Sequence, residues 1–378
     1  MRFGRSFKLF TLFGFVVKVD LSWIVIAGLV TWSLAMGLFP YLYRELPVET
    51  YWVMGVVGAL GLFASIIFHE FCHSLVARHF GMTMKGITLF IFGGVAEMGD
   101  EPPSARAEFL MAAAGPLSSL FIAAVAFLIY LLGLQSHWPT PVNGVLRYLA
   151  YINALLAGFN LLPAFPLDGG RILRSILWGA KDNLRWATRV SANIGAAFGI
   201  GLILLGILQV ISGNFIGGLW MFLIGMFLRG AAQMSYQQVL VRSALEGEPV
   251  KRFMSAQPVT VPPTITVEEL VEDYIYKHHF AMFPVVADEK LVGCITTREV
   301  KEVPREEWGR RTIGSLVRQC STDNTVPPET DAVKALALMN QTGNTRLLVV
   351  DQGRLVGVVT LKDLLDFFSL KVELEERE

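Results

Sequence analysis

Long apolar runs separated by short polar connections fill the first 240 residues of the chain. A helix needs about 20 mostly apolar residues to cross a bilayer, and six runs reach that length. They are Leu21–Tyr41, Tyr51–Phe80, Ala107–Leu134, Val142–Leu162, Ala187–Ile211 and Phe215–Met234. The pattern therefore predicts an α-helical polytopic membrane domain with about six transmembrane helices.

Two segments of this region depart from the helical pattern. Between the second and third runs, MTMKGITLFIFGGVAEMGDEPP alternates apolar residues around a Gly93-Gly94 pair, which predicts a strand-like hairpin. Such backbone must be buried in protein or lie at the membrane interface, because lipid cannot satisfy its polar groups. The N-terminal MRFGRSFKLFTLFGFVV has the basic start and apolar run of a signal peptide but no small-residue cleavage site. We expect a retained amphipathic or strand segment there.

Basic residues gather on one side of the predicted spans. On that side lie Arg2, Arg5, Lys8, Lys18, Lys85, Arg106, Arg171, Arg174, Lys181 and Arg185, whereas the opposite connections carry mainly Arg44 and Arg147. Cytoplasmic loops of membrane proteins are enriched in Lys and Arg. The distribution predicts a multi-pass protein of the plasma membrane with both termini in the cytoplasm.

After about Ser243 the sequence becomes polar and contains an internal repeat. VTVPPTITVEEL resembles NTVPPETDAVKAL, and FPVVADEKLVGCITTREV resembles LLVVDQGRLVGVVTLKDL about 64 residues later. Each copy predicts a short strand, a helix, two strands joined by a turn, and a helix, and two copies can bury their apolar faces together. We therefore divide the chain into a membrane domain, 1–242, and a soluble α/β domain, 243–378, with copies at 243–306 and 307–370.

Composition agrees with this division and excludes some functions. Hydrophobic residues make up 53% of the chain and charged residues 17%, against about 25% charged in a typical soluble protein. The net charge is zero, so no basic field indicates nucleic-acid binding. The three cysteines, Cys72, Cys294 and Cys320, are too few and too scattered for a disulfide framework.

The second apolar run contains the sequence His-Glu-x-x-His at His69, Glu70 and His73. Residues four apart on a helix project from nearly the same face, so the two imidazoles can hold one zinc ion and Glu70 can reach a water on it. Ionisable groups in a spanning helix are costly and usually functional. The alternative is that these residues lie at the interface and serve only as snorkelling or capping groups.

A third zinc ligand is expected, because catalytic zinc sites usually have three protein ligands and a water. Asp168 is the best candidate; it lies in NLLPAFPLDGGR, a break just after the fourth run. Taken alone, Asp168-Gly169 also reads as an ordinary turn with an aspartate cap. With cytoplasmic termini, however, the second and fourth spans both run inward, which puts Asp168 at the depth of the two histidines.

Two asparagines near this region are further candidates. Asn160 could position substrate or donate a hydrogen bond to an oxyanion, or it could bond backbone at the proline break. Asn153 has a weaker case, since one polar residue in a span can pack against another helix.

The motifs HEFCH, FGGVAEM, AAAGPL and NLLPAFPLDGGR occur in the order found in the site-2 protease family of intramembrane zinc metalloproteases, which this half of the chain resembles. The resemblance implies cleavage of transmembrane segments of substrate proteins, with His69, His73 and Asp168 as zinc ligands, Glu70 as catalytic acid-base, and Asn160 near the active site. Many members have an asparagine shortly after the Gly-Pro of AGPL, where this chain has Ser118 and Ser119. We expect this departure to affect helix packing and not the metal site.

The soluble repeat resembles a tandem pair of CBS domains. The signals are two LVG segments and a Gly-x-x-Thr-x-x-acid pattern, which includes Thr296 and Glu299 in copy one and Thr360 and Asp363 in copy two. The resemblance implies that the acid binds ribose hydroxyls and the threonine a phosphate of ATP, ADP or AMP. Copy two fits the pattern better. Alternatively, these residues only cap the following helices.

Together these observations predict an intramembrane zinc metalloendopeptidase regulated by its CBS pair through an adenine nucleotide. The expected substrate is a membrane protein with a transmembrane segment, and a homodimer through the CBS pair is a further expectation. The alternative is a CBS-regulated transporter or channel that uses the same four side chains as an ion path. A catalytically inactive scaffold is a weaker third interpretation, because every expected ligand and Glu70 are present.

Overall fold

The computed structural model describes residues 6–82, 84–90, 93–98 and 101–375. Its contacts divide the chain into two compact units, Met1–Gln237 and Gln238–Glu378. The division falls inside one long helix, α8 (Phe215–Leu245), close to the boundary at 242 that the composition predicts. Each unit is described by itself.

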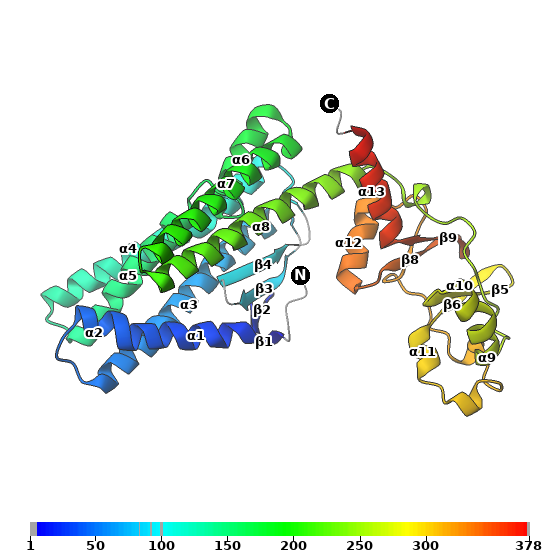
Figure 1. Ribbon diagram of the computed structural model, residues 1–378, viewed down its shortest axis with the longest axis horizontal. Coiled ribbons are helices and arrows are strands. Elements are labelled where there is room, and N and C mark those ends of the chain that lie inside the picture. Colours follow the sequence, from blue (N-terminus) through cyan, green and yellow to red (C-terminus); the bar gives the residue numbers. More distant parts are fainter. Residues whose placement is uncertain (1–5, 83, 91–92, 99–100, 376–378) are drawn as a thin grey trace. The chain divides into compact units, whose positions relative to one another are not determined.

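Long helices make up most of the first unit (Figure 1). They are α1 (Leu21–Ser33), which continues through η1 (Leu34–Leu38) into α2 (Phe39–Leu42), then α3 (Val48–His79), α4 (Ala105–Gln135), α5 (Thr140–Asn160), α6 (Asp168–Lys181), α7 (Leu184–Ile211) and α8. Five helical stretches among the described residues are long and apolar enough to cross a membrane: Leu21–Leu42, Val48–His79, Ala105–Gln135, Leu184–Ile211 and Phe215–Leu245. These five confirm the corresponding predicted spans.

The fourth predicted span is the helix α5, but α5 is less apolar than the others. It carries Asn143, Arg147 and Asn153 among its 21 residues and is not one of the five candidate spans. Asn143 and Asn153 are buried, so α5 turns polar side chains toward neighbouring helices. A sixth crossing of the membrane therefore stays a prediction.

A four-stranded sheet covers part of α3. Its strands are β1 (Ser6–Leu12), β2 (Phe15–Asp20), β3 (Met84–Phe90) and β4 (Gly93–Met98), in that order across the sheet. The β3–β4 hairpin and the N-terminal strands confirm the sequence expectations. The local sequence pattern does not predict that these strands form one sheet. They are joined because β2 pairs in parallel with β3, with Val17 opposite Ile87. Both of these side chains are buried.

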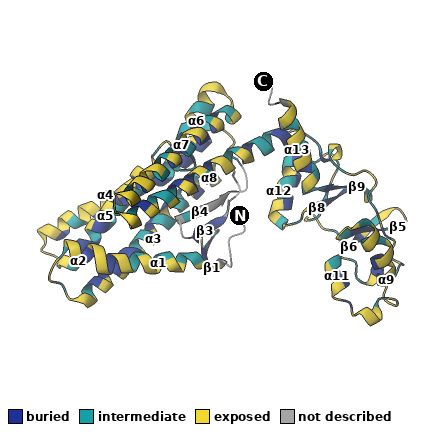
Figure 2. Cartoon of the chain, viewed as in Figure 1, coloured by how far each residue is buried: buried dark blue, intermediate teal, exposed yellow. Residues whose placement is uncertain are grey.

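Polarity in the first unit is distributed as a lipid-facing protein requires. A buried cluster between the N-terminal helices, α3 and α5 includes Phe39, Met54 and Tyr148. Many exposed residues of the long helices are large and apolar, for example Leu117 and Phe121 on α4, and Figure 2 shows exposed residues along most outer helix faces. This apolar exterior suits hydrocarbon rather than water.

Helices α7 and α8 pack so closely that their backbones are in contact. A Cβ on Gly199 would lie 2.7 Å from the carbonyl oxygen of Gly225, and a Cβ on Gly206 would lie 2.6 Å from that of Gly218. Small residues at membrane helix interfaces allow such close packing. The glycines are therefore required at these two levels of the helix pair.

The second unit contains the two predicted copies. The first has α9 (Val267–Glu269), η3 (Leu270–Ile275), α10 (Tyr276–His278), β5 (Met282–Ala287), β6 (Lys290–Thr296) and α11 (Thr297–Lys301). The second has β7 (Thr325–Val326), α12 (Ala332–Thr342), β8 (Arg346–Asp351), β9 (Arg354–Thr360) and α13 (Leu361–Glu375). Single 3₁₀ turns lie at η2 (Val250–Arg252), η4 (Arg305–Glu307) and η5 (Ile313–Ser315). Strands β5 and β8 begin 64 residues apart, as do β6 and β9, which confirms the repeat.

Residues near the start of each copy complete the sheet of the other copy. Ser255, near the start of copy one, forms a bridge to Val358 on β9 of copy two, and Arg318, near the start of copy two, forms a bridge to Cys294 on β6 of copy one. Val250 also belongs to the buried core of copy two. The two copies are therefore joined by exchanged segments and fold as one unit.

Candidate metal centre

Helix α3 presents the two histidines of the His-Glu-x-x-His motif on one buried face. His69 and His73 lie one helical turn apart, and only 4% and 9% of their surfaces are exposed. The helix continues to His79, so His69 lies about 15 Å from its end at 1.5 Å per residue. The histidines are therefore well inside the helix and not at a frayed terminus.

Asp168 joins the histidines from a distant part of the chain. It is the first residue of α6, and its Oδ2 lies 3.0 Å from Nε2 of His69 and 3.2 Å from Nε2 of His73. The two Nε2 atoms are 3.1 Å apart. These residues form the only group of three or more potential metal-ligating side chains found within the described ranges.

The outer nitrogens of both rings are held by helix α4. Nδ1 of His73 lies 2.7 Å from the carbonyl oxygen of Met111. A carbonyl only accepts, so Nδ1 donates its hydrogen and leaves the lone pair of His73 on Nε2. Nδ1 of His69 lies 2.9 Å from Oγ of Ser119. Partners of this kind orient metal-binding imidazoles, and both direct Nε2 toward Asp168.

The donor set and its spacing fit a zinc ion. Zinc bonds of about 2.0–2.2 Å in a tetrahedral arrangement hold the donor atoms about 3.3–3.5 Å apart, slightly more than the distances between the three side chains. Gly115 leaves the necessary room, because a Cβ at this position would collide with Nε2 of both histidines. Two imidazoles and one carboxylate also leave a fourth position for water or substrate, as in catalytic zinc sites.

Glu70 follows His69 on α3 and lies beneath the edge strand of the sheet. A Cβ on Gly94 would approach its Cγ to 2.8 Å, so β4 passes directly over this side chain. The Glu70 side chain is half-buried. It is therefore enclosed between α3 and a strand whose outer edge has no neighbour in the four-stranded order.

The two asparagines have different surroundings. Asn153 is fully buried and donates to Oγ of Ser65 on α3 at 3.1 Å, the helix-packing role considered for it. Asn160 is the half-buried last residue of α5. Among the described residues, no hydrogen bond joins its side chain to the metal-ligating group, so its assignment stays a prediction.

The sequence motifs do not predict the part played at this centre by Met111, Gly115 and Ser119. Gly115 belongs to the AAAGPL stretch, which could have identified it. Ser119 stands where we expected an effect on helix packing only, but its hydroxyl contacts His69, one of the candidate metal ligands. No local signal identifies Met111, because its backbone carbonyl makes the contact.

In the second unit, the threonine-acid pairs act as helix caps. Thr360 N–H and Oγ1 both lie 2.8 Å from Oδ2 of Asp363. Thr296 and Glu299 form the equivalent capping box at the start of α11, and Oε1 of Glu299 also lies 3.3 Å from Nε of Arg318. Burial alone would raise the pKa of Glu299, but the Thr296 hydrogen bonds and Arg318 hold it below its ordinary value.

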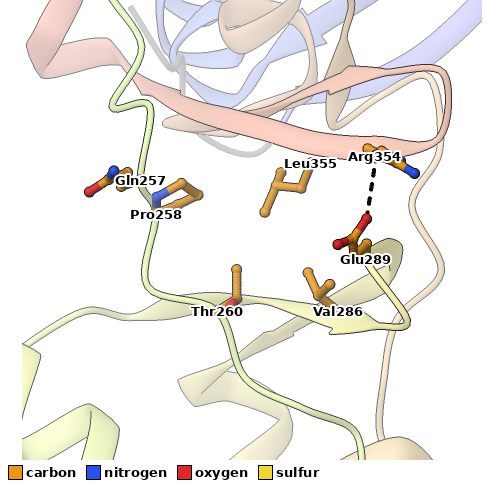
Figure 3. A pocket seen from close by; sticks show the side chains of 7 residues that line it. All are labelled: Gln257, Pro258, Thr260, Val286, Glu289, Arg354 and Leu355. Carbon is orange, nitrogen blue, oxygen red and sulfur yellow. Dashed lines mark ion pairs between the residues drawn. The ribbon is translucent and has the colours of Figure 1, made fainter.

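A cleft of about 450 Å³ lies elsewhere in the second unit. Figure 3 shows its walls, which come from residues 257–260 of copy one, the end of β5 with the β5–β6 turn, and the start of β9. An ion pair between Glu289 and Arg354 lies at one side. Its lining residues are Gln257, Pro258, Thr260, Val286, Glu289, Arg354 and Leu355. None of the four predicted nucleotide-contacting residues lines it.

Models of known protein families match both the membrane half and the soluble half of the chain. The profile described as Peptidase family M50 matches residues 57–140 and 135–205, which include all three candidate metal ligands and Glu70. The profile described as CBS domain matches residues 250–306 and 316–370.

Similar proteins cover nearly the whole chain. The protein named "Putative zinc metalloprotease Rip3" in Mycobacterium tuberculosis is 35% identical over 364 residues, which is 94% of this chain and 92% of that protein. Zinc metalloprotease MJ0392 of Methanocaldococcus jannaschii is 31% identical over 373 residues, 98% of each. Among solved structures, the site-2 protease from Methanocaldococcus jannaschii is 30% identical and covers 61% of this chain and 94% of its own, with a TM-score of 0.43.

Proposed function

Because the chain belongs to Peptidase family M50, the site-2 protease family of zinc metalloproteases, and carries a pair of CBS domains, we propose that it hydrolyses peptide bonds within transmembrane segments of membrane proteins. One observation carries this proposal. The ligating atoms of His69, His73 and Asp168 lie 3.0–3.2 Å apart, and α3, which supplies the histidines, is apolar and long enough to span a membrane.

The residues of the chain divide the work of peptide hydrolysis. When bound, zinc would acidify a coordinated water and polarise the substrate carbonyl. Glu70 accepts the proton of the attacking water and later delivers it to the leaving amine. Asn160, if it turns toward the substrate, donates a hydrogen bond that positions the scissile carbonyl.

The substrate must be extended at the cut, because a helix shields its peptide carbonyls. Strand β4 is one of the two outer strands of the sheet and passes over Glu70, which supports pairing between β4 and an extended substrate segment. Single proline substitutions from Gly86 to Val95 should reduce cleavage while zinc remains bound. Unchanged cleavage across this series would exclude strand pairing.

The CBS pair is proposed to bind an adenine nucleotide and regulate proteolysis. Asp363 is the better ribose ligand, because no ion pair engages its carboxylate among the described residues, whereas Glu299 is paired with Arg318. Regulation requires different nucleotide affinities for the active and inactive states. Association of two CBS pairs would make a homodimer, and tags on each terminus would test the proposed cytoplasmic location of both ends.

The deciding experiment compares wild type with Glu70→Gln in reconstituted vesicles that contain a single-span substrate. Glu70→Gln should keep one zinc per chain and lose cleavage by about 100-fold to 10,000-fold. His79→Ala, on the exposed end of the same helix, is the matched control and should behave as wild type. Ion flux measured in the same vesicles tests the transporter alternative. Normal cleavage by Glu70→Gln, or flux without cleavage, would contradict the proposal.

A further inference from the structure

A buried ion pair connects α6 to α4. Nε of Arg174 lies 2.6 Å from Oε1 of Glu108, and its Nη2 also contacts that oxygen. The pair is almost free of solvent, with 3% of Arg174 and 0% of Glu108 exposed. Glu101 adds a weaker contact to Nη2 at 3.4 Å.

Stability alone is a poor reason for this pair. Removing two charges from water is expensive, and replacing a buried ion pair by apolar residues is often neutral or stabilising. What distinguishes the pair is its place in the chain. Helix α6 begins with Asp168, and α4 supplies the Met111 carbonyl and the Ser119 hydroxyl that hold the two histidines.

The guanidinium of Arg174 also touches the segment that leads into Asp168. Its Cζ lies 5.2 Å from the ring centre of Phe165, three residues before Asp168. The backbone of Phe165 is fixed closely from two sides, because a Cβ at Gly170 or at Gly195 would collide with it. Arg174 therefore contacts both the helix that orients the histidines and the loop that delivers the carboxylate.

We propose that Arg174 and Glu108 are positioning residues that set the distance between Asp168 and the two histidines. Arg174 is six residues beyond Asp168, about 9 Å along the helix axis, so it acts through α6 and not on the ion. Glu108 fixes the other end of the connection, three residues before Met111. The inference rests on the proposed function only in taking the three side chains as a zinc site.

Two variants separate positioning from simple stabilisation. Arg174→Lys keeps the charge but loses the planar fork that contacts Glu108 while lying over Phe165. The double variant Glu108→Leu with Arg174→Met removes both buried charges and leaves only Glu101, which is partly exposed, without its contact to Arg174. If the pair serves only to stabilise the fold, the double variant should bind zinc as wild type does.

The experiment measures zinc affinity of the full chain in detergent by competition with a chromogenic chelator, together with thermal unfolding of the metal-free protein. Both variants should bind zinc about 10-fold more weakly or worse, and Arg174→Lys should keep a cooperative unfolding transition. Lys181→Gln, which removes an exposed charge at the far end of α6, should leave the affinity unchanged.

The possible failures are distinguishable. Wild-type zinc affinity in Arg174→Lys would overturn the positioning role, even if the double variant does not fold. A wild-type chain that binds no zinc would overturn the proposed function and the inference with it.

Discussion

The metal centre and the CBS pair use their carboxylates in opposite ways. Asp168 directs one oxygen at histidines 95 and 99 positions away in the sequence, whereas Glu299 and Asp363 bond to threonines three residues before them. A cap at the start of its own helix has a sufficient local explanation. Side-chain donor atoms that converge from separate helices have no such local explanation, so the structure supports the candidate metal site far more strongly than the candidate nucleotide site.

The acidic residues of the two CBS copies also differ in their charged partners. Glu299 of copy one is engaged by Arg318, which comes from the exchanged segment. The corresponding segment, which copy one contributes to the sheet of copy two, brings Ser255, which carries no charge. The two copies therefore have closely matched backbones, but the Glu299 carboxylate is engaged in an ion pair that the Asp363 carboxylate lacks among the described residues.

The largest effect is expected from Gly115→Ala, which tests whether the convergence serves an ion. The added Cβ would collide with Nε2 of both histidines, so zinc affinity should fall by more than about 100-fold, beyond the usual loss from an outer partner. Zinc content after dialysis measures this. Gly158→Ala on α5, where a Cβ meets nothing within 4 Å, is the matched control. Full zinc content in Gly115→Ala would mean that the convergence of His69, His73 and Asp168 does not serve zinc binding, and the contrast with the CBS carboxylates would be lost.

A smaller loss is expected from Ser119→Ala, which removes the hydroxyl beside Nδ1 of His69. Outer partners of metal-binding histidines typically contribute 10-fold to 100-fold in affinity, and we expect about 10-fold, since the hydroxyl is neutral. Ser118→Ala is the control, because that hydroxyl bonds a carbonyl of its own helix. Equal zinc affinities in the two variants would reduce Ser119 to a packing residue.

Within the CBS pair, Asp363→Asn should weaken binding of an adenine nucleotide by about 10-fold, the loss of one charged hydrogen bond. Glu299→Gln should change the affinity less than about 3-fold, because Arg318 already occupies that carboxylate. Calorimetric titration with ATP and AMP measures both, and thermal unfolding corrects for the lost caps, each of which contributes about 1 kcal/mol. Equal losses of nucleotide affinity in the two variants would show that Asp363 and Glu299 contribute equally to binding.

The smallest effect concerns Cys294, which stands in copy one where copy two has Val358. A hydrogen bond from Cys320 lowers the pKa of the Cys294 thiol to about 7, against the opposing effect of burial. The thiolate is the reactive form, so modification by a small alkylating reagent should speed up as pH rises through 7 and level off above it. Cys320→Ala should raise that pKa and slow the reaction at pH 7 several-fold. Mass spectrometry of the Cys294 peptide measures the rate, and an identical pH profile would show that the two thiols do not interact.

Local periodicity carries most of what the sequence predicts correctly. Four-residue spacing fixes His69 and His73 on one face whatever the surroundings, and a 64-residue offset identifies the repeat before any contact is known. The proximity of Asp168 to the histidines agrees with the prediction from charge distribution and ligand chemistry. The apolar runs likewise identify five helices that could span a membrane.

What the sequence does not predict depends on how elements rotate and pair. Ser119 faces His69 only because α4 lies against α3 with one particular face inward. The parallel pairing of β2 with β3 joins segments separated by the whole of α3, and no turn signal specifies it. The Arg318–Glu299 pair similarly depends on an exchanged segment whose route only tertiary packing determines.

If the protein cleaves transmembrane segments as proposed, the close backbone contacts between α7 and α8 restrict the path by which such a segment can reach the site. A foreign helix could part these two helices only by breaking glycine contacts at both levels, which leave no space for intervening side chains or lipid. Lateral entry of a substrate segment toward Glu70 would consequently occur along some other seam of the helix assembly.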